Sequence, residues 1–322
     1  MYYDTMKLCN FSNTNYHVGW YKNKWQGLVE FLDENQMDGI ELLLHGNENI
    51  KDIPKDIVKG LHLSYFPTWL EFYTGQSCVE DFPTKEAVVR AFGGEDKVAI
   101  HNRFSRDFEI AKKLKTEYMV YHVGHVTIKE AYSFKFSYTN KDVLSETLNI
   151  VNDVFVGEGP TLLFENLWWP GLTLLDKEEL EWFMEKVSYK NKGIMLDLSH
   201  LLITNPSIQT MDQAVDYIIE CLNNLGDAIR WIKGIHINGT MVHDYMNEDH
   251  QIHYQSYLAA SEEERFIEIY KHISSMDQHL PFKHERLKEI LNLVQPKFEM
   301  IEVVGRDRQT WEGYVKEQLK YL

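Results

Sequence analysis

Acidic and imidazole side chains recur at the carboxyl ends of short apolar runs in this sequence. Such runs form strands that are buried on both faces, where Val, Ile and Leu are usual and an unpaired charged group costs several kcal/mol. Carboxylates that share one buried volume repel one another, so a divalent cation between them is the simplest explanation for their presence. The residues concerned are His62, His122, His125, Glu165, Asn166, Asp197, His200, His236, Asn238 and Glu302.

The types of these donors restrict the ion that they could hold. Glu, Asp and His without any Cys suit a borderline or hard divalent metal, such as Mn²⁺, Co²⁺, Mg²⁺, Fe²⁺ or Zn²⁺. Asp197 and His200 are three residues apart, so both can reach one ion if the chain turns at the end of the strand. We expect the metal ligands to include Glu165, Asp197, His236 and Glu302.

Eight apolar runs of this kind predict eight strands. Each run is too short for a buried helix and suits a strand that is covered on both faces. The predicted strands are Met6–Cys9, Gly39–Leu44, Leu61–Tyr65, Tyr118–Val123, Thr161–Phe164, Gly193–Leu198, Gly234–Ile237 and Phe298–Val304.

Helical patterns lie between the predicted strands. Strands that alternate with helices of this length predict a closed (β/α)₈ TIM barrel of the α/β class. An open doubly wound sheet is the main alternative, but it needs a Gly-rich phosphate turn after the first strand, and CNFSNTNYHVGW contains none. The predicted helices are Trp25–Asn35, Phe104–Lys115, Lys141–Phe155, Lys177–Val187, Met211–Leu225, Lys283–Leu293 and Trp311–Leu322.

Two connections are much longer than the others. They follow the third and seventh predicted strands, and the second contains a helical stretch of its own at Ser261–Ser275. The loops after the strands of a barrel build its active site, so we expect these two to form lids or pocket walls. Since no Pro-, Gly- or Ser-rich linker divides the chain, we expect a single domain over residues 1–322.

Composition limits the classes of partner. Among 322 residues, 33 basic and 49 acidic side chains give a formal net charge of −16, and a field of this sign repels nucleic-acid phosphates. Three widely spaced cysteines form neither a disulfide framework nor a CxxC zinc site. The sequence has no apolar run of membrane-spanning length and no signal-like start, so we expect a cytoplasmic protein without a membrane partner.

The strand-end motifs resemble those of the xylose isomerase-like TIM barrel superfamily. This superfamily contains sugar and sugar-phosphate isomerases and epimerases, related dehydratases, and the endonuclease IV group. The resemblance covers essentially the whole chain, and its metal ligands on strands five to eight are shared by the isomerase and nuclease branches. The matching residues are Glu165 in LLFEN, Asp197 and His200 in LDLSH, His236 in GIHING and Glu302 in MIEVV.

Further residues resemble the nuclease branch, in which extra histidines hold additional zinc ions. His62 in LHLSY and His122 in YHVG match the histidines of strands three and four. In this reading both are metal ligands. Alternatively, they hydrogen-bond a substrate hydroxyl or a neighbouring carboxylate.

The nuclease branch also has an Asp-x-His motif in the loop after strand seven. The best match here is Asp277-Gln-His279, which precedes Leu-Pro-Phe, although isomerase relatives carry a similar motif. A rival placement uses Asp249, His250 or His253. The long insertion before Asp277 and the missing glycines after the proline depart from the family pattern, so both placements stay open.

Side chains beside the expected ligands could bind a substrate. Trp168 and Trp169 follow Glu165 directly and are either core residues, a wall against the apolar face of a sugar ring, or a contact within a homo-oligomer. An arginine after the last strand could hold a substrate phosphate. The expected substrate-binding residues are Tyr65, His125, Asn166, Trp168, Trp169, Asn238 and Arg306.

Two functions fit these residues. In the first, an isomerase, epimerase or related enolate-forming lyase binds a carbohydrate-like substrate through one ion of Mn, Co, Mg or Zn, and Glu165 and Glu302 transfer the proton. In the second, an endonuclease IV-like hydrolase uses two or three zinc ions to cleave a phosphodiester. The acidic chain lacks clustered Arg and Lys for a DNA phosphate track, so sequence reasoning favours the isomerase.

Overall fold

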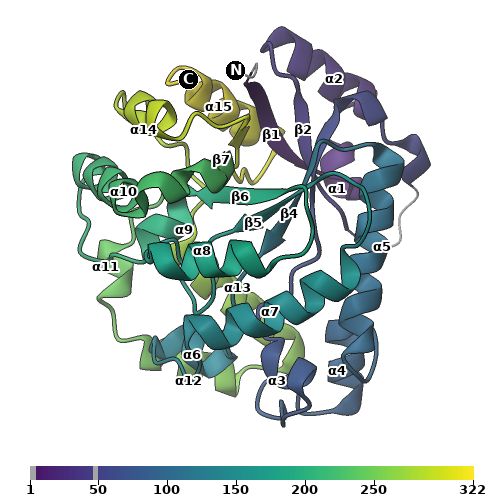
Figure 1. Cartoon of the computed structure of the whole chain (residues 1–322), viewed down its shortest axis with the longest axis vertical. Coiled ribbons are helices and arrows are strands. Elements are labelled where there is room, and N and C mark those ends of the chain that lie inside the picture. The colour runs from purple at the N-terminus through teal and green to yellow at the C-terminus, as the bar shows by residue number, and fades with distance from the viewer. Residues whose placement is uncertain (1–4, 46–49) are drawn as a thin grey trace.

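The structure, a computed structural model, describes residues 5–45 and 50–322, which form a closed barrel of eight parallel strands (Figure 1). Each strand pairs with the next in the sequence, and β8 pairs with β1 to close the barrel. The prediction of a (β/α)₈ TIM barrel is therefore confirmed. The strands are β1 (Met6–Ser12), β2 (Gly39–Leu43), β3 (Val58–His62), β4 (Tyr118–His122), β5 (Thr161–Glu165), β6 (Lys192–Asp197), β7 (Ile232–Ile237) and β8 (Phe298–Ile301).

Helices surround the barrel, and none of those in the described residues is long and apolar enough to cross a membrane (Figure 1). The α-helices are α1 (Asn15–Val18), α2 (Trp25–Glu34), α3 (Leu70–Thr74), α4 (Lys85–Phe92), α5 (Val98–Leu114), α6 (Ile128–Ser133), α7 (Asn140–Val154), α8 (Lys177–Lys186), α9 (Leu198–Ile203), α10 (Met211–Leu225), α11 (His243–Met246), α12 (His250–Ala259), α13 (Glu262–Met276), α14 (Leu287–Val294) and α15 (Arg308–Leu319). Short 3₁₀ helices are η1 (Ile50–Asp52), η2 (Lys55–Ile57) and η3 (Gly226–Trp231).

Successive side chains of each strand point alternately to the surrounding helices and to the barrel interior. On β5, Leu162 and Phe164 pack in the core beneath the helices, whereas Leu163 packs with the residues inside the barrel. Glu165 stands two residues beyond Leu163 and therefore faces the interior as well. The same spacing turns the polar residues at the other strand ends towards the barrel axis.

The lower part of the barrel interior is filled by apolar side chains and closed to water. Leu8, Tyr118, Leu163 and their neighbours form this floor, and each is fully buried. Gly60 makes room for the Tyr118 ring, because a Cβ atom at residue 60 would lie 2.3 Å from Tyr118 Cζ. Polar residues at the strand ends thus stand on a packed hydrophobic base.

The two long connections carry helices, as expected. Helices α3, α4 and α5 follow β3, and helices α11 to α14 follow β7. Helix α12 packs against both α6 and α13, at the lower edge of Figure 1. The third strand occupies Val58–His62 rather than the predicted Leu61–Tyr65, because pairing with β2 and β4 outweighs the weak apolar signal of Lys59 and Gly60.

Candidate metal centre

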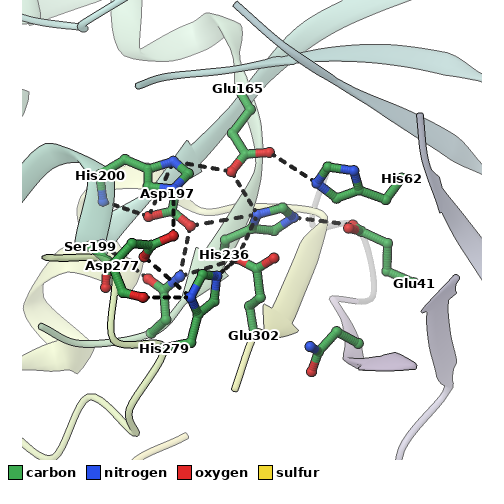
Figure 2. A network of polar contacts seen from close by, with 12 residues as sticks. Glu41, His62, Glu165, Asp197, Ser199, His200, His236, Asp277, His279 and Glu302 are labelled. Atoms are coloured by element: carbon green, nitrogen blue, oxygen red, sulfur yellow. Dashed lines mark hydrogen bonds and ion pairs between the residues drawn. The ribbon is translucent and has the colours of Figure 1, made fainter. Parts of the chain in front are cut away.

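Ionisable side chains on β2 to β7, together with Glu302 directly after β8, lie in one volume at the carboxyl end of the barrel. Figure 2 shows most of them. Glu165, Asp197 and His236 in this volume are completely buried. Three further residues join them, His200 from helix α9 and Asp277 and His279 from the loop after α13. We name the whole set the polar cluster, and its members are Glu41, His62, His122, Glu165, Asp197, His200, His236, Asp277, His279 and Glu302.

Four members of the polar cluster form a candidate metal site, since Glu165, Asp197, His236 and Glu302 each offer one donor atom within 4.8 Å of the others. His236 Nδ1 lies 3.2 Å from both Glu165 Oε1 and Glu302 Oε2. The distance from His236 Nδ1 to Asp197 Oδ2 is 3.7 Å. Ligands that bind one ion at about 2.0–2.1 Å stand about 2.9 Å apart in an octahedron and about 3.3 Å apart in a tetrahedron. This donor spacing fits a divalent ion.

A second candidate site shares Glu165 with the first and adds His62 and His122. His122 Nε2 lies 2.9 Å and His62 Nε2 lies 3.6 Å from Glu165 Oε2. Although these atoms are close, the buried Oε2 has no hydrogen-bond partner among the described residues. A buried carboxylate oxygen without a hydrogen bond is costly, whereas a cation held jointly with the two imidazoles would satisfy it. The two oxygens of Glu165 therefore face two different ligand groups.

Asp277, His279 and His200 form a third group at the mouth of the barrel (Figure 2). His200 Nε2 lies 3.4 Å from Asp277 Oδ2, and His279 Nδ1 lies 3.3 Å from Asp277 Oδ1. His279 Nε2 is also 3.6 Å from Glu302 Oε2. The backbone of His279 adopts a left-handed φ of 47°, which is unfavourable for a residue with a Cβ atom and is typical of functional sites.

Carboxylates raise the pKa of several imidazoles in the cluster, whereas burial outweighs Glu165 at His122 and lowers its pKa. Burial alone would lower the pKa of His236, but the negative charges of Glu41, Glu302 and Glu165 outweigh it and hold the pKa well above the usual value. Burial likewise acts to lower the pKa of His62 and of His279, but neighbouring carboxylates outweigh it. The pKa of His62 therefore rises to about 9 and that of His279 to about 10. An incoming metal ion must therefore displace protons from these rings.

The imidazoles in turn affect the pKa of the carboxylates. Burial would raise the pKa of Glu165, but His122 and His236 hold it well below the usual value. Asp197 behaves differently, since burial outweighs the effect of nearby imidazoles and raises its pKa to about 6. The cluster thus combines ionised carboxylates with a proton-sharing network, an arrangement that concentrates negative potential for a cation.

A family model described as a xylose isomerase-like TIM barrel matches residues 73–322. The chain belongs to this family. No curated protein matches the chain by sequence. The family resemblance predicted from the strand-end motifs is therefore confirmed.

Solved structures with the same fold differ in their named activities. Endonuclease IV from Thermus thermophilus has 14% sequence identity and a TM-score of 0.53, with 98% of each chain covered. The probable 3-DHS dehydratase AsbF from Bacillus anthracis has 14% identity and a TM-score of 0.52, with 98% of this chain and 97% of that chain covered. The 3-keto-D-glucoside 4-epimerase YcjR from E. coli has 12% identity and a TM-score of 0.51, with 99% and 100% covered. At these identities the likeness shows the fold alone.

The structure brings all nine residues predicted as metal ligands into the polar cluster. It also separates the two placements of the family's Asp-x-His motif, because Asp277 and His279 contact other cluster residues. Asp249 instead caps α12, where its side chain accepts a hydrogen bond from the backbone of Gln251. His253 pairs with Glu248 at 3.1 Å. His250, the third alternative, packs against the Phe134 and Tyr245 rings.

Some of the predicted substrate-binding residues lie beside the cluster. The Tyr65 ring is 4.3 Å from that of His122, and the Trp168 ring is 5.1 Å from that of His200. The Tyr65 hydroxyl and the Trp168 Nε1 are buried and have no hydrogen-bond partner among the described residues, so both are available as donors. Trp169 is only 3% exposed and packs within the chain, which argues against the Trp pair as a subunit contact.

The two predicted asparagines orient the carboxylates. Asn238 Nδ2 donates hydrogen bonds to Asp197 Oδ2 at 2.7 Å and to Glu302 Oε2 at 3.1 Å. Asn166 exchanges hydrogen bonds with the backbone of Asp197, at 2.8 Å and 3.1 Å. Because both amides are fully buried, they act as fixed supports for the ligands.

Two residues predicted to bind substrate make their contacts outside the polar cluster, and their role in substrate binding stays a prediction. His125 is buried in the loop after β4, where its Nδ1 accepts 3.3 Å hydrogen bonds from the backbone N–H groups of Trp69 and Leu70 in the connection after β3. The Arg306 side chain is 88% exposed and lies beside Asp307, 3.5 Å away. Sequence position at a strand end does not reveal which way the chain turns after the strand.

Glu41 is the cluster residue that sequence reasoning missed. It lies in the apolar run GIELLL, is completely buried, and has Oε2 3.1 Å from His236 Nε2. The signal was present, because a glutamate inside a strand that is buried on both faces requires a partner. Its position in the middle of the run, rather than at the end, concealed it.

Proposed function

We propose that the protein is a metal-dependent hydrolase that cleaves a phosphate ester of a small molecule. The observation that supports this proposal is the position of Glu165, whose two oxygens face two separate ligand groups. The third group lies adjacent, since His200 contacts both Glu165 and Asp277. Sites in which neighbouring ions share a carboxylate are typical of enzymes that hydrolyse phosphate esters.

The chain's own residues have distinct tasks in this proposal. The three ligand groups would hold divalent ions that activate water and neutralise charge on the phosphoryl group. Tyr65 directs an unpartnered hydroxyl group at this region, where burial and then the charges of Glu165 and Asp277 raise its pKa well above the usual value. Tyr65 therefore stays protonated and can donate a hydrogen bond to the substrate. Trp168 provides an apolar wall that limits water beside the cluster.

The negative charge of the protein favours a small substrate over a nucleic-acid duplex. The formal net charge of −16 disfavours a long polyanion, and Arg306 points into solvent beside Asp307. A single phosphate ester needs only the ions, which the polar cluster would hold, and a few donors such as the Tyr65 hydroxyl group beside it. We therefore expect no cleavage of duplex DNA.

A carbohydrate isomerase or epimerase is the second candidate. Glu165 Oε1 and Glu302 Oε2 both lie 3.2 Å from His236 Nδ1, so these carboxylates flank one ion position, as removal and return of a proton require. Sequence reasoning ranked this function first. The second ligand group, in which His62 and His122 lie beside the other oxygen of Glu165, favours the hydrolase, because an isomerase needs only the four-ligand site.

Metal content and turnover of the purified protein separate the two functions. We expect two or three ions per chain and metal-dependent release of 4-nitrophenolate from bis(4-nitrophenyl) phosphate, without cleavage of an abasic-site duplex. His122→Gln should abolish this hydrolysis, whereas the control His253→Gln should leave it unchanged. One ion per chain, with deuterium incorporation from solvent into a ketose that survives His122→Gln, would support the isomerase and overturn the proposal.

A further inference from the structure

Glu41 contacts His236 on the side opposite the candidate metal ligands. Its Oε2 lies 3.1 Å from His236 Nε2, while His236 Nδ1 faces the carboxylates of Glu165 and Glu302 at 3.2 Å (Figure 2). His236 is thus held between one carboxylate at its Nε2 side and several at its Nδ1 side. Both Glu41 and His236 are completely buried, so water does not compete for either nitrogen.

The structure around Glu41 is built to accommodate its side chain. The pairing of β2 with β3 shifts register between Ile40 and Glu41, which places Glu41 opposite Gly60. Gly60 in turn leaves space for the Tyr118 ring. Burial, followed by the charge of Glu41, raises the pKa of Tyr118 well above its usual value, so the phenol below Glu41 stays neutral. His236 contacts Glu41 directly, and the charge of Glu41 also helps to raise the pKa of His62.

We propose that Glu41 is a positioning residue of the metal centre, which it serves by fixing the tautomer and orientation of His236. A neutral imidazole has one N–H group and one lone pair. When Nε2–H donates to Glu41, the lone pair of Nδ1 is directed at the position shared by Glu165, Asp197 and Glu302. A carboxylate partner also makes the imidazole a stronger donor to a metal. This inference rests on the metal centre of the proposed function.

A purely structural role for Glu41 has different consequences. If Glu41 only filled space or paired with His236 in the folded chain, its loss would lower the stability of the metal-free protein and leave metal affinity unchanged. If Glu41 positions His236, its loss weakens metal binding even where the protein remains folded. Metal affinity is therefore the informative quantity.

The test compares Glu41→Gln, Glu41→Asp and the wild type in the full-length protein. Glutamine keeps the size of the side chain but can present its amide N–H to His236 Nε2, which favours the wrong tautomer. Aspartate keeps the charge at a greater distance from the ring. Glu299→Gln is the matched control, because Glu299 is a half-buried strand glutamate at the opposite end of the barrel, beside Lys7. Affinity for Zn²⁺ is measured by competition with a chelator, and the bound geometry by the absorption spectrum of the Co²⁺ form.

We expect Glu41→Gln to bind Zn²⁺ about 10–100-fold more weakly and to show an altered Co²⁺ spectrum. Glu41→Asp should recover part of this loss, and Glu299→Gln should match the wild type. Wild-type affinity in Glu41→Gln would overturn the inference. If Glu41→Gln does not fold, the aspartate variant decides, and wild-type affinity in that variant overturns it. Wild-type protein that binds Zn²⁺ but hydrolyses no phosphate ester would refute the proposed function while leaving this comparison valid.

Discussion

Removal of the Glu165 charge should empty two metal sites at once. Glu165 belongs to both candidate metal sites, one with Asp197, His236 and Glu302 and one with His62 and His122. In Glu165→Gln each site loses its shared anionic donor, so we expect metal affinity at both sites to fall by more than about 100-fold. Loss of a residue that contacts only a ligand, and not the metal, lowers affinity by about 10–100-fold. By contrast, His122→Gln disturbs only one of the two sites.

The loss of bound ions has a calculable effect on thermal stability. An ion present at about 1,000 times its Kd stabilises the folded state by about 4 kcal/mol. Unfolding entropy of about 2.1 cal/mol/K per residue gives about 0.7 kcal/mol/K for 322 residues. Each ion should therefore raise Tm by about 6 °C, and two ions by about 12 °C. Glu165→Gln should lose at least about two-thirds of this increment, and His122→Gln at most about half of it.

Differential scanning calorimetry with and without metal, together with elemental analysis, measures both quantities. Glu299→Gln serves as the control, since it removes a glutamate charge from a barrel strand away from the cluster. A Glu165→Gln protein that retains the full ion content and the full metal-induced rise in Tm would refute the shared role of Glu165. An equal loss in the Glu299→Gln control would show that the effect is general.

The pH dependence of stability, the C-terminal helix and an exposed arginine provide further tests. The pKa values of His62 and His279 rise from 6.5 to about 9 and about 10, so their ion pairs stabilise the metal-free fold fully below pH 6.5 and are lost as the pH rises to about 10. Urea unfolding should show declining stability across that range, and a flat profile would contradict the ion pairs. Gln318→Met should lower the free energy of unfolding in urea by about 2–4 kcal/mol. The buried Gln318 amide accepts a hydrogen bond from the N–H group of Phe282 and donates one to its C=O group, and methionine makes neither. A loss below about 1 kcal/mol would contradict this. Arg306→Ala should leave KM within about twofold in steady-state kinetics, and a tenfold rise would return Arg306 to the substrate site.

The fold could be predicted because its signal repeats along the chain. Each apolar run marks a strand, and each intervening amphipathic segment marks a helix, so one misplaced boundary does not change the architecture. The ends of helices and strands were less predictable where side-chain capping or pairing with neighbouring strands decides them. Helix α7 begins at Asn140 rather than at the predicted Lys141, since the side chains of Thr139 and Asp142 form a reciprocal capping box. On β3, residues Val58 to Gly60 are strand because their neighbours pair with them.

The candidate ligands of the site could be predicted from the sequence, but the residues around them could be predicted less well. Alternation along a strand sends residues such as Glu165 and Asp197 to the barrel axis, and the sequence contains that alternation. Loop residues have no such rule, so the sequence does not show whether side chains such as those of His125 and Arg306 point towards the site. Glu41 was missed for a third reason, because its partner His236 lies 195 residues away in the sequence.

The most direct test of the central claim is an anomalous difference map from crystals of the protein soaked with Zn²⁺ or Mn²⁺. The account predicts peaks on both sides of the Glu165 carboxylate, each about 2.0–2.2 Å from one of its oxygens, with one peak beside His236 Nδ1 and the other beside His122 Nε2. A map with no peak at Glu165, or with the ion held elsewhere on the chain, would contradict it.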